Sequence, residues 1–94
     1  MTKGDILAFL KKHKQMLSDN YQVKHIGLFG SYATGTNTDK SDIDIVVDMP
    51  SSFDLYYDLK EYLESAFERS VDLGLKKSIR GMVREKIESE TIYV

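Results

Sequence analysis

Two aspartates separated by one residue, Asp42 and Asp44, begin the most hydrophobic strand-like segment of this 94-residue chain. Side chains two positions apart on a β-strand share a face, with Cα atoms about 6.6–7 Å apart. Two such carboxylates raise each other's pKa unless a cation lies between them. Because the chain has no cysteine and carboxylate oxygens are hard ligands, the expected cation is Mg²⁺ or Mn²⁺ rather than Zn²⁺.

A third carboxylate, Asp72, lies in a second apolar segment, residues 70–75. Strand alternation places Asp72 and Gly74 on one face of this segment and its apolar side chains on the other. If the two segments are neighbouring strands, Asp72 joins Asp42 and Asp44 in one cluster. Three aspartates with about two divalent ions suit in-line phosphoryl or nucleotidyl transfer, because the ions neutralise the attacking and leaving oxygens and one carboxylate accepts the nucleophile's proton.

The dipeptide Gly30-Ser31 directly follows a third strand-like segment, residues 23–29. Glycine has no side chain to block a ligand, so backbone N–H groups and the Ser31 hydroxyl can approach a phosphate there. A helical turn over residues 31–35 would add to the attraction. The loop is not a Walker P-loop, since no Gly-Lys-Ser/Thr follows. An EF-hand is also excluded, because the glycine and glutamate positions of that loop hold other residues.

Apolar periodicity predicts the elements that carry these residues. They are a helix opened by a capping box at Thr2–Asp5 and broken at Asp19-Asn20, a strand over residues 23–29, a strand over 42–48, a helix capped by Ser51 with Asp54 and ending near residue 69, a strand over 70–75 and a helix over 79–88. The last helix is expected to pack through Ile79, Met82, Val83 and Ile87.

The order α-β-β-α-β-α predicts an α/β (α+β) fold: a small mixed β-sheet flanked by helices. A helical crossover over residues 51–69 allows the second and third strands to be parallel neighbours. The loop between the first and second strands is too short for a full crossover helix.

Composition indicates one globular domain over residues 1–94, since a chain of this length holds one core. The longest aliphatic run, residues 45–47, is too short to cross a bilayer, so no membrane association is expected. A net charge of −2 gives no general attraction to nucleic acid. The absence of cysteine is compatible with a reducing cytoplasm, the expected location. Lys11, Lys12 and Lys14, and the basic residues between 76 and 86, are expected to face solvent.

The spacing of Gly30-Ser31, Ser41-Asp42-Ile43-Asp44 and Val71-Asp72-Leu73 resembles the nucleotidyltransferase superfamily, which includes DNA polymerase beta. It is similar in particular to the minimal nucleotidyltransferases, the MntA-type antitoxins encoded beside HEPN-domain toxins. The resemblance covers nearly the whole chain and implies the nucleotidyltransferase fold.

The resemblance implies a role for each motif residue. Gly30 and Ser31 would hold the phosphates of ATP, Asp42 and Asp44 would bind two Mg²⁺ ions, and Asp72 would complete the site and activate the acceptor hydroxyl. Members of this group transfer AMP to a hydroxyl, and those paired with HEPN toxins modify a toxin tyrosine and so silence its RNase activity. A domain this small cannot enclose both ATP and an acceptor, so a toxin partner is expected to complete the cleft.

One position departs from the family's pattern, which usually reads Gly-Ser-x-Ala-Arg-Gly, because Thr34 occupies the arginine position. Threonine offers one hydroxyl where arginine offers a fork of charged donors. A catalytically weak or inactive antitoxin that neutralises its partner by binding alone therefore stays an alternative. An RNA-directed nucleotidyltransferase is a second alternative, although the acidic charge balance counts against it. The three intact aspartates favour retained chemistry.

Overall fold

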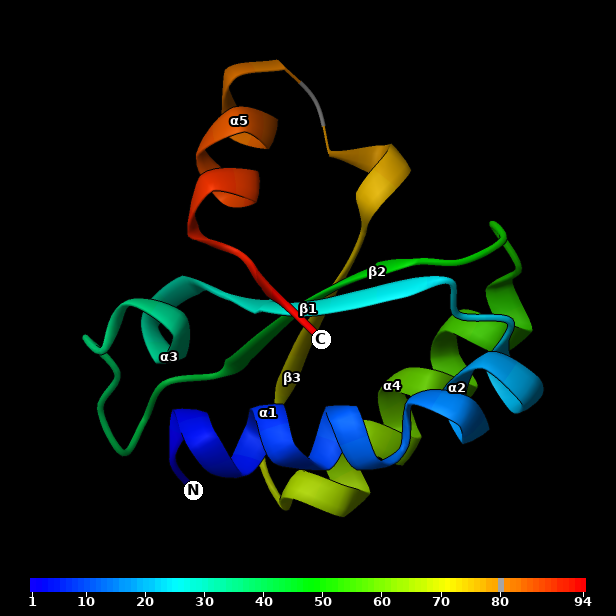
Figure 1. Cartoon of the computed structure of the whole chain (residues 1–94), viewed down its shortest axis with the longest axis horizontal. Helices are drawn as coiled ribbons and strands as arrows, with labels where there is room; N and C mark the ends of the chain where they lie inside the picture. The colour runs from blue at the N-terminus through cyan, green and yellow to red at the C-terminus, as the bar shows by residue number, and fades with distance from the viewer. Residues whose placement is uncertain (80) are drawn as a thin grey trace.

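A four-stranded mixed sheet in the order β3-β2-β1-β4 organises the computed structural model, which describes residues 1–79 and 81–94 (Figure 1). The elements along the chain are α1 (Lys3–Lys12), α2 (Lys14–Tyr21), β1 (His25–Phe29), α3 (Gly30–Thr34), β2 (Ile43–Asp48), α4 (Phe53–Phe67), β3 (Val71–Leu75), the 3₁₀ turn η1 (Lys76–Ser78), α5 (Gly81–Glu90) and β4 (Ile92–Tyr93). The predicted class, a small mixed sheet flanked by helices, is confirmed. Arg80, in the predicted last helix, lies outside the described residues.

The pairing of the three predicted strands follows from their connections. The helical crossover α4 makes β2 and β3 parallel neighbours, as predicted, and Asp44 is opposite Asp72. The short connection between β1 and β2 makes this pair antiparallel, and Phe29 is opposite Asp44. Each of these strands begins one or two residues later than the sequence predicts.

The N-terminal helix begins with the predicted capping box, in which Thr2 and Asp5 exchange hydrogen bonds between side chain and backbone. It is not one helix, however, because His13 departs from helical geometry and separates α1 from α2. The predicted break at Asp19-Asn20 is wrong. Asp19 instead accepts a 3.0 Å hydrogen bond from Gln15 one turn earlier, which supports the helix, and α2 ends where Gln22 adopts a left-handed conformation.

The crossover helix α4 begins one residue later than predicted. Its N-cap is Ser52, whose hydroxyl accepts a hydrogen bond from the Leu55 N–H at 3.4 Å, so the prediction of Ser51 as the cap is wrong. Glu68 ends the helix in a left-handed conformation with φ 54°. The helices α1, α2 and α4 all lie on one side of the sheet (Figure 1).

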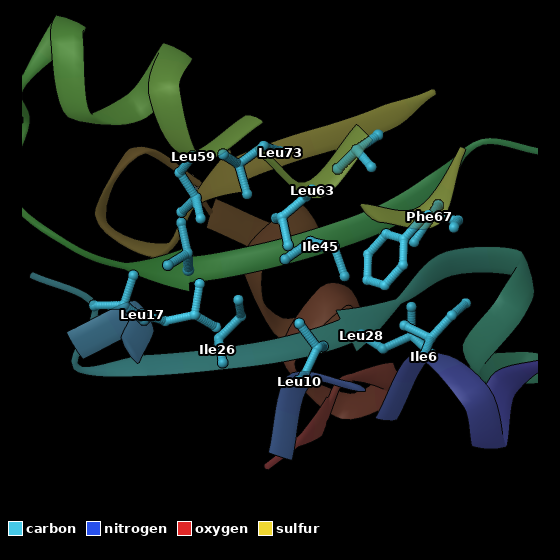
Figure 2. Close-up of a cluster of buried hydrophobic side chains, with 14 of the residues drawn as sticks. Ile6, Leu10, Leu17, Ile26, Leu28, Ile45, Leu59, Leu63, Phe67 and Leu73 are labelled. Carbon is cyan, nitrogen blue, oxygen red and sulfur yellow. The ribbon is translucent and has the colours of Figure 1, made fainter. Parts of the chain in front are cut away.

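The hydrophobic core lies between these three helices and one face of the sheet (Figure 2). Alternate strand positions supply apolar side chains to it, and the helices supply one per turn. The side chains labelled in the close-up are Ile6, Leu10, Leu17, Ile26, Leu28, Ile45, Leu59, Leu63, Phe67 and Leu73. This one-sided burial forces the polar side chains of β2 and β3 onto the opposite face.

The opposite face of the sheet carries α5, which contacts α3 and β1. The predicted apolar stripe of this helix is wrong in part. Met82 and Val83 are 87% and 61% exposed, whereas Ile87 of the predicted stripe is half-buried. The sequence pattern also missed β4, a two-residue strand that pairs antiparallel with β1. Among the described helices, none combines the length and apolarity that crossing a membrane requires.

Truncation of Leu63 tests this arrangement of the core. Leu63 is fully buried, so Leu63→Ala is expected to lower the free energy of unfolding by about 2–5 kcal/mol through lost burial and a residual cavity. Met82→Ala, on exposed α5, is expected to change it by less than about 0.5 kcal/mol. Equilibrium urea denaturation measures both, and a large loss for Met82→Ala would contradict the exposed placement of this side chain.

Candidate active site

The parallel pair β2–β3 brings Asp44 and Asp72 together on the face of the sheet opposite the core. Their neighbours Ile43, Ile45 and Leu73 are buried in the core, so the alternation of both strands turns the two aspartates the other way. Asp42 directly precedes β2 and is exposed, as is Asp72, whereas Asp44 is half-buried between them.

The charge on this cluster is not compensated by the described protein. Burial, the charges of Asp72 and Asp42 and a hydrogen bond with Asp72 together raise the pKa of Asp44 to about 6, burial contributing most. Within residues 1–79 and 81–94 the one ion pair joins Arg84 to Glu88 on α5 and involves none of these carboxylates. The site therefore favours either a proton or a cation.

The donor set fits a hard divalent cation, because all three side chains are carboxylates. In the described part of the chain, no three His, Asp or Glu side chains lie close enough together to form a complete metal-binding cluster. Asp42 and Asp72 are exposed, so the arrangement is compatible with an ion but is not closed around one. Asp44 is the fixed member of the set.

Gly30 lies directly against the Asp44 carboxylate. A Cβ at this position would overlap the Asp44 carboxylate, so any other residue would force that carboxylate to move. The backbone of Gly30 also has φ 71°, in the left-handed region that favours glycine. Glycine is therefore required twice, for its conformation and for its close approach to Asp44.

Ser31 is half-buried in the first turn of α3, which forms the helical turn that the sequence suggested. Phe29 is the N-cap of α3, and no side chain caps its first N–H groups. Thr34, at the position of the family arginine, uses its hydroxyl within the same segment: it donates to the Gly30 carbonyl at 3.2 Å and contacts the Thr36 hydroxyl at 3.0 Å.

Sequence reasoning missed Arg69, which follows α4 and holds the loop before Asp42. Its guanidinium Nη1 donates a 2.9 Å hydrogen bond to the Asp39 carbonyl, and the Ile43 N–H donates to the Ser70 carbonyl at 3.0 Å. These bonds attach the Asp42 end of β2 to the start of β3. The sequence carries no signal for Arg69, because its acceptor is a backbone carbonyl thirty positions away.

A surface hollow of about 710 Å³ lies away from the aspartates. It is bordered by α1, α2 and the residues before β1, and its lining includes Lys11, Lys12, Lys14 and Lys24. These lysines are exposed, as the sequence predicts for the first three. The exposure of Asp42 and Asp72 makes the aspartate site part of the open surface.

Neutralising Asp44 tests the electrostatic description of the metal-free protein. Between its ordinary pKa of 3.8 and about 6, the folded chain binds a proton that the unfolded chain does not. The stability gained from this proton is full below pH 4 and is lost as the pH rises through 6. We therefore expect Asp44→Asn to raise Tm at pH 7 by roughly 4–8 °C, or about 1 kcal/mol after allowance for partial exposure, and to have little effect at pH 4.

Thermal unfolding in the presence of EDTA at both pH values measures this difference. Asp58→Asn, on the exposed part of α4, serves as the matched control and is expected to leave Tm unchanged at either pH. Equal stabilisation by Asp44→Asn at pH 4 and pH 7 would contradict a raised pKa.

Comparison with known proteins identifies relatives along nearly the whole chain. A Methanocaldococcus jannaschii protein that bears the name of a protein adenylyltransferase is 48% identical over 99% of this chain and 98% of its own length. "Protein adenylyltransferase MntA" of Thermococcus cleftensis is 35% identical over 100% of this chain and 97% of its own.

Solved structures give the same result. A toxin–antitoxin crystal structure with AMP-PNP matches 88% of this chain and 69% of its own, with a TM-score of 0.72 and 30% identity. A minimal nucleotidyltransferase matches 98% of this chain and 95% of its own with a TM-score of 0.83; at 22% identity this match concerns the fold alone. The family model for the nucleotidyltransferase domain matches residues 10–94, so this chain belongs to the nucleotidyltransferase family and is an enzyme of that class.

Proposed function

We propose that this chain is a Mg²⁺-dependent adenylyltransferase that transfers AMP from ATP to a tyrosine hydroxyl of a cognate HEPN-domain toxin and so acts as its antitoxin. The observation that carries the proposal is the placement of Asp44 opposite Asp72, directly against Gly30. This arrangement sets the proposed acidic groups beside the proposed phosphate-holding turn. A cytoplasmic location, where ATP and Mg²⁺ are available, is part of the proposal.

Each residue has a distinct proposed role. Asp42, Asp44 and Asp72 hold the divalent ions, which neutralise charge on the phosphates when bound. Gly30 leaves the backbone accessible to phosphate, and the Ser31 hydroxyl donates to it. The acceptor oxygen forms a bond to the α-phosphorus of ATP while the bond to pyrophosphate breaks. Asp72, the exposed carboxylate, takes up the proton of the acceptor hydroxyl.

The openness of the site supports a protein acceptor. Asp42 and Asp72 are exposed on the sheet surface, where a side chain of another protein can reach them. The similar chain in the AMP-PNP structure belongs to a toxin–antitoxin pair, and the Thermococcus relative is named as a protein adenylyltransferase. Both observations support a nucleotide substrate and a toxin partner for this chain.

A second function, neutralisation of the partner by binding alone, is favoured by one observation. The Thr34 hydroxyl is engaged with the Gly30 carbonyl, so the position of the family arginine offers no charged donor to a phosphate. The two functions differ in a single respect: only the first requires the three carboxylates.

Labelled ATP tests the enzymatic proposal. Incubation with α-³²P-ATP, Mg²⁺ and the purified HEPN-domain toxin is expected to label the toxin, and EDTA is expected to abolish the label. Asp72→Asn should reduce the rate about 10²–10⁴-fold because it removes the proton acceptor. Asp54→Asn, an exposed carboxylate on α4, is the matched control and should retain the wild-type rate.

The absence of label from wild-type protein that binds the toxin would sink the enzymatic proposal. If Asp42→Asn/Asp44→Asn then still co-purified with the toxin and still protected cells, neutralisation by binding would be the function. Label recovered in RNA instead of protein would indicate an RNA-directed enzyme.

Restoring the family arginine tests the role of Thr34. A guanidinium gives phosphate a charge-assisted donor worth about 1.5–3 kcal/mol, so Thr34→Arg is expected to lower the Kd for Mg²⁺–ATP about tenfold or more. Asn37→Arg adds the same charge to the exposed loop and is expected to change the Kd less than about threefold, since exposed charges are screened. Isothermal titration calorimetry measures both; equal tightening by the two variants would show a general charge effect.

A further inference from the structure

We propose that Glu64 and Tyr56 are positioning residues that hold the backbone of β3 on either side of Asp72. The inference rests on the proposed function only in giving Asp72 a part in transfer. Both residues lie on α4 and neither touches the site. Their contacts are with the peptide groups of Val71 and Leu73, the immediate neighbours of Asp72.

The strand that carries Asp72 is intrinsically weak. β3 is an edge strand of five residues that pairs with β2 alone. The backbone groups of Val71 and Leu73 face away from β2, because those of Ser70 and Asp72, on either side of Val71, face it. Edge strands with unpartnered outer groups are the segments that open first.

Two side chains of α4 form hydrogen bonds with these outer backbone groups. Glu64 Oε2 accepts a 3.0 Å hydrogen bond from the Val71 N–H, and the Tyr56 hydroxyl donates a 2.6 Å hydrogen bond to the Leu73 carbonyl. Both bonds are partly buried, which strengthens them relative to exposed bonds. They take the place of the strand that β3 lacks.

The geometry of α4 explains why one helix can make both contacts. Glu64 and Tyr56 are eight residues apart, slightly more than two helical turns, and therefore share a face. Leu59 and Leu63 lie on that side of α4 as well and pack beside Leu73 of β3 (Figure 2). The apolar contacts fix the distance between helix and strand, and the two polar contacts fix the strand along its length.

The consequence concerns the Asp72 carboxylate. It is exposed, and apart from its hydrogen bond with Asp44 it depends on its own backbone to stay opposite that residue. Fixing the peptide groups before and after it restricts that backbone, so the carboxylate is pre-positioned at the acceptor side of the site. Loss of the two hydrogen bonds from α4 should lower the rate of transfer more than it weakens the binding of ATP, which depends on Gly30 and Ser31.

Three variants and a control test these two hydrogen bonds in the full chain. Glu64→Ala removes the acceptor, Glu64→Gln keeps an amide oxygen that can still accept from Val71, and Tyr56→Phe removes only the hydroxyl. Glu61→Ala is the matched control, an exposed carboxylate on the same helix. Amide hydrogen exchange is measured at Asp72 and Gly74, with Ile26 and Leu28 of β1 as internal references. The kcat and the KM for ATP of toxin labelling are measured at a temperature where every variant is folded.

For Glu64→Ala we expect about tenfold faster exchange at Asp72 and Gly74 with no change at Ile26 and Leu28. The kcat should fall about tenfold while the KM for ATP stays within about twofold. Glu64→Gln should recover most of both effects, Tyr56→Phe should show a smaller change in the same direction, and Glu61→Ala should match the wild type.

Unchanged exchange and kcat in Glu64→Ala would overturn the inference. Faster exchange throughout β1 and β3 would also overturn it, since that result indicates only a general loss of stability. If the wild type labels no toxin, the proposed function fails, and the exchange measurements alone then decide whether Glu64 and Tyr56 hold β3.

Discussion

The parallel register of β2 and β3 is the constraint on which the rest of this structure depends. It places Asp44 opposite Asp72, and it is held by the burial of Ile43 and Ile45 against Val71 and Leu73. A slip by one residue would turn Ile43 and Ile45 to solvent and Asp44 into the core. The hydrophobic effect on one face of the sheet therefore determines the distance between charges on the other.

The site combines electrostatic repulsion among three carboxylates with exposure to solvent. Asp44 is desolvated between two further carboxylates, and no described cation of the chain is paired with them. Such an arrangement lowers stability in the absence of a ligand, and it persists because the core and the α4 contacts fix the strands independently. Gly30 makes room for this arrangement, because the Asp44 carboxylate occupies the space that a side chain at position 30 would need.

Features that depend on strand alternation and on local helix capping could mostly be predicted from the sequence. Contacts with backbone groups far away in the chain mostly could not. The placement of Asp44 on the sheet face opposite the core and the Thr2 capping box follow from local spacing, and the parallel β2–β3 pair follows from the crossover helix. The strand β4 is too short to show a pattern and forms only because the edge of β1 accepts it. The exposure of Met82 could not be foreseen, because helical periodicity does not reveal whether a partner face exists. Bonds from Arg69 to a backbone carbonyl leave no sequence signature at all.

The two edge strands of the sheet, β3 and β4, limit how this fold can bind another protein. On one side, side chains of α4 occupy the outer backbone groups of β3; on the other, β4 offers only two residues. Neither margin presents a long row of vacant amides and carbonyls, so recruitment of a foreign strand to extend the sheet is disfavoured. Recognition must then operate through side chains, and the same blunted margins protect a small sheet from stacking edge to edge with its own copies.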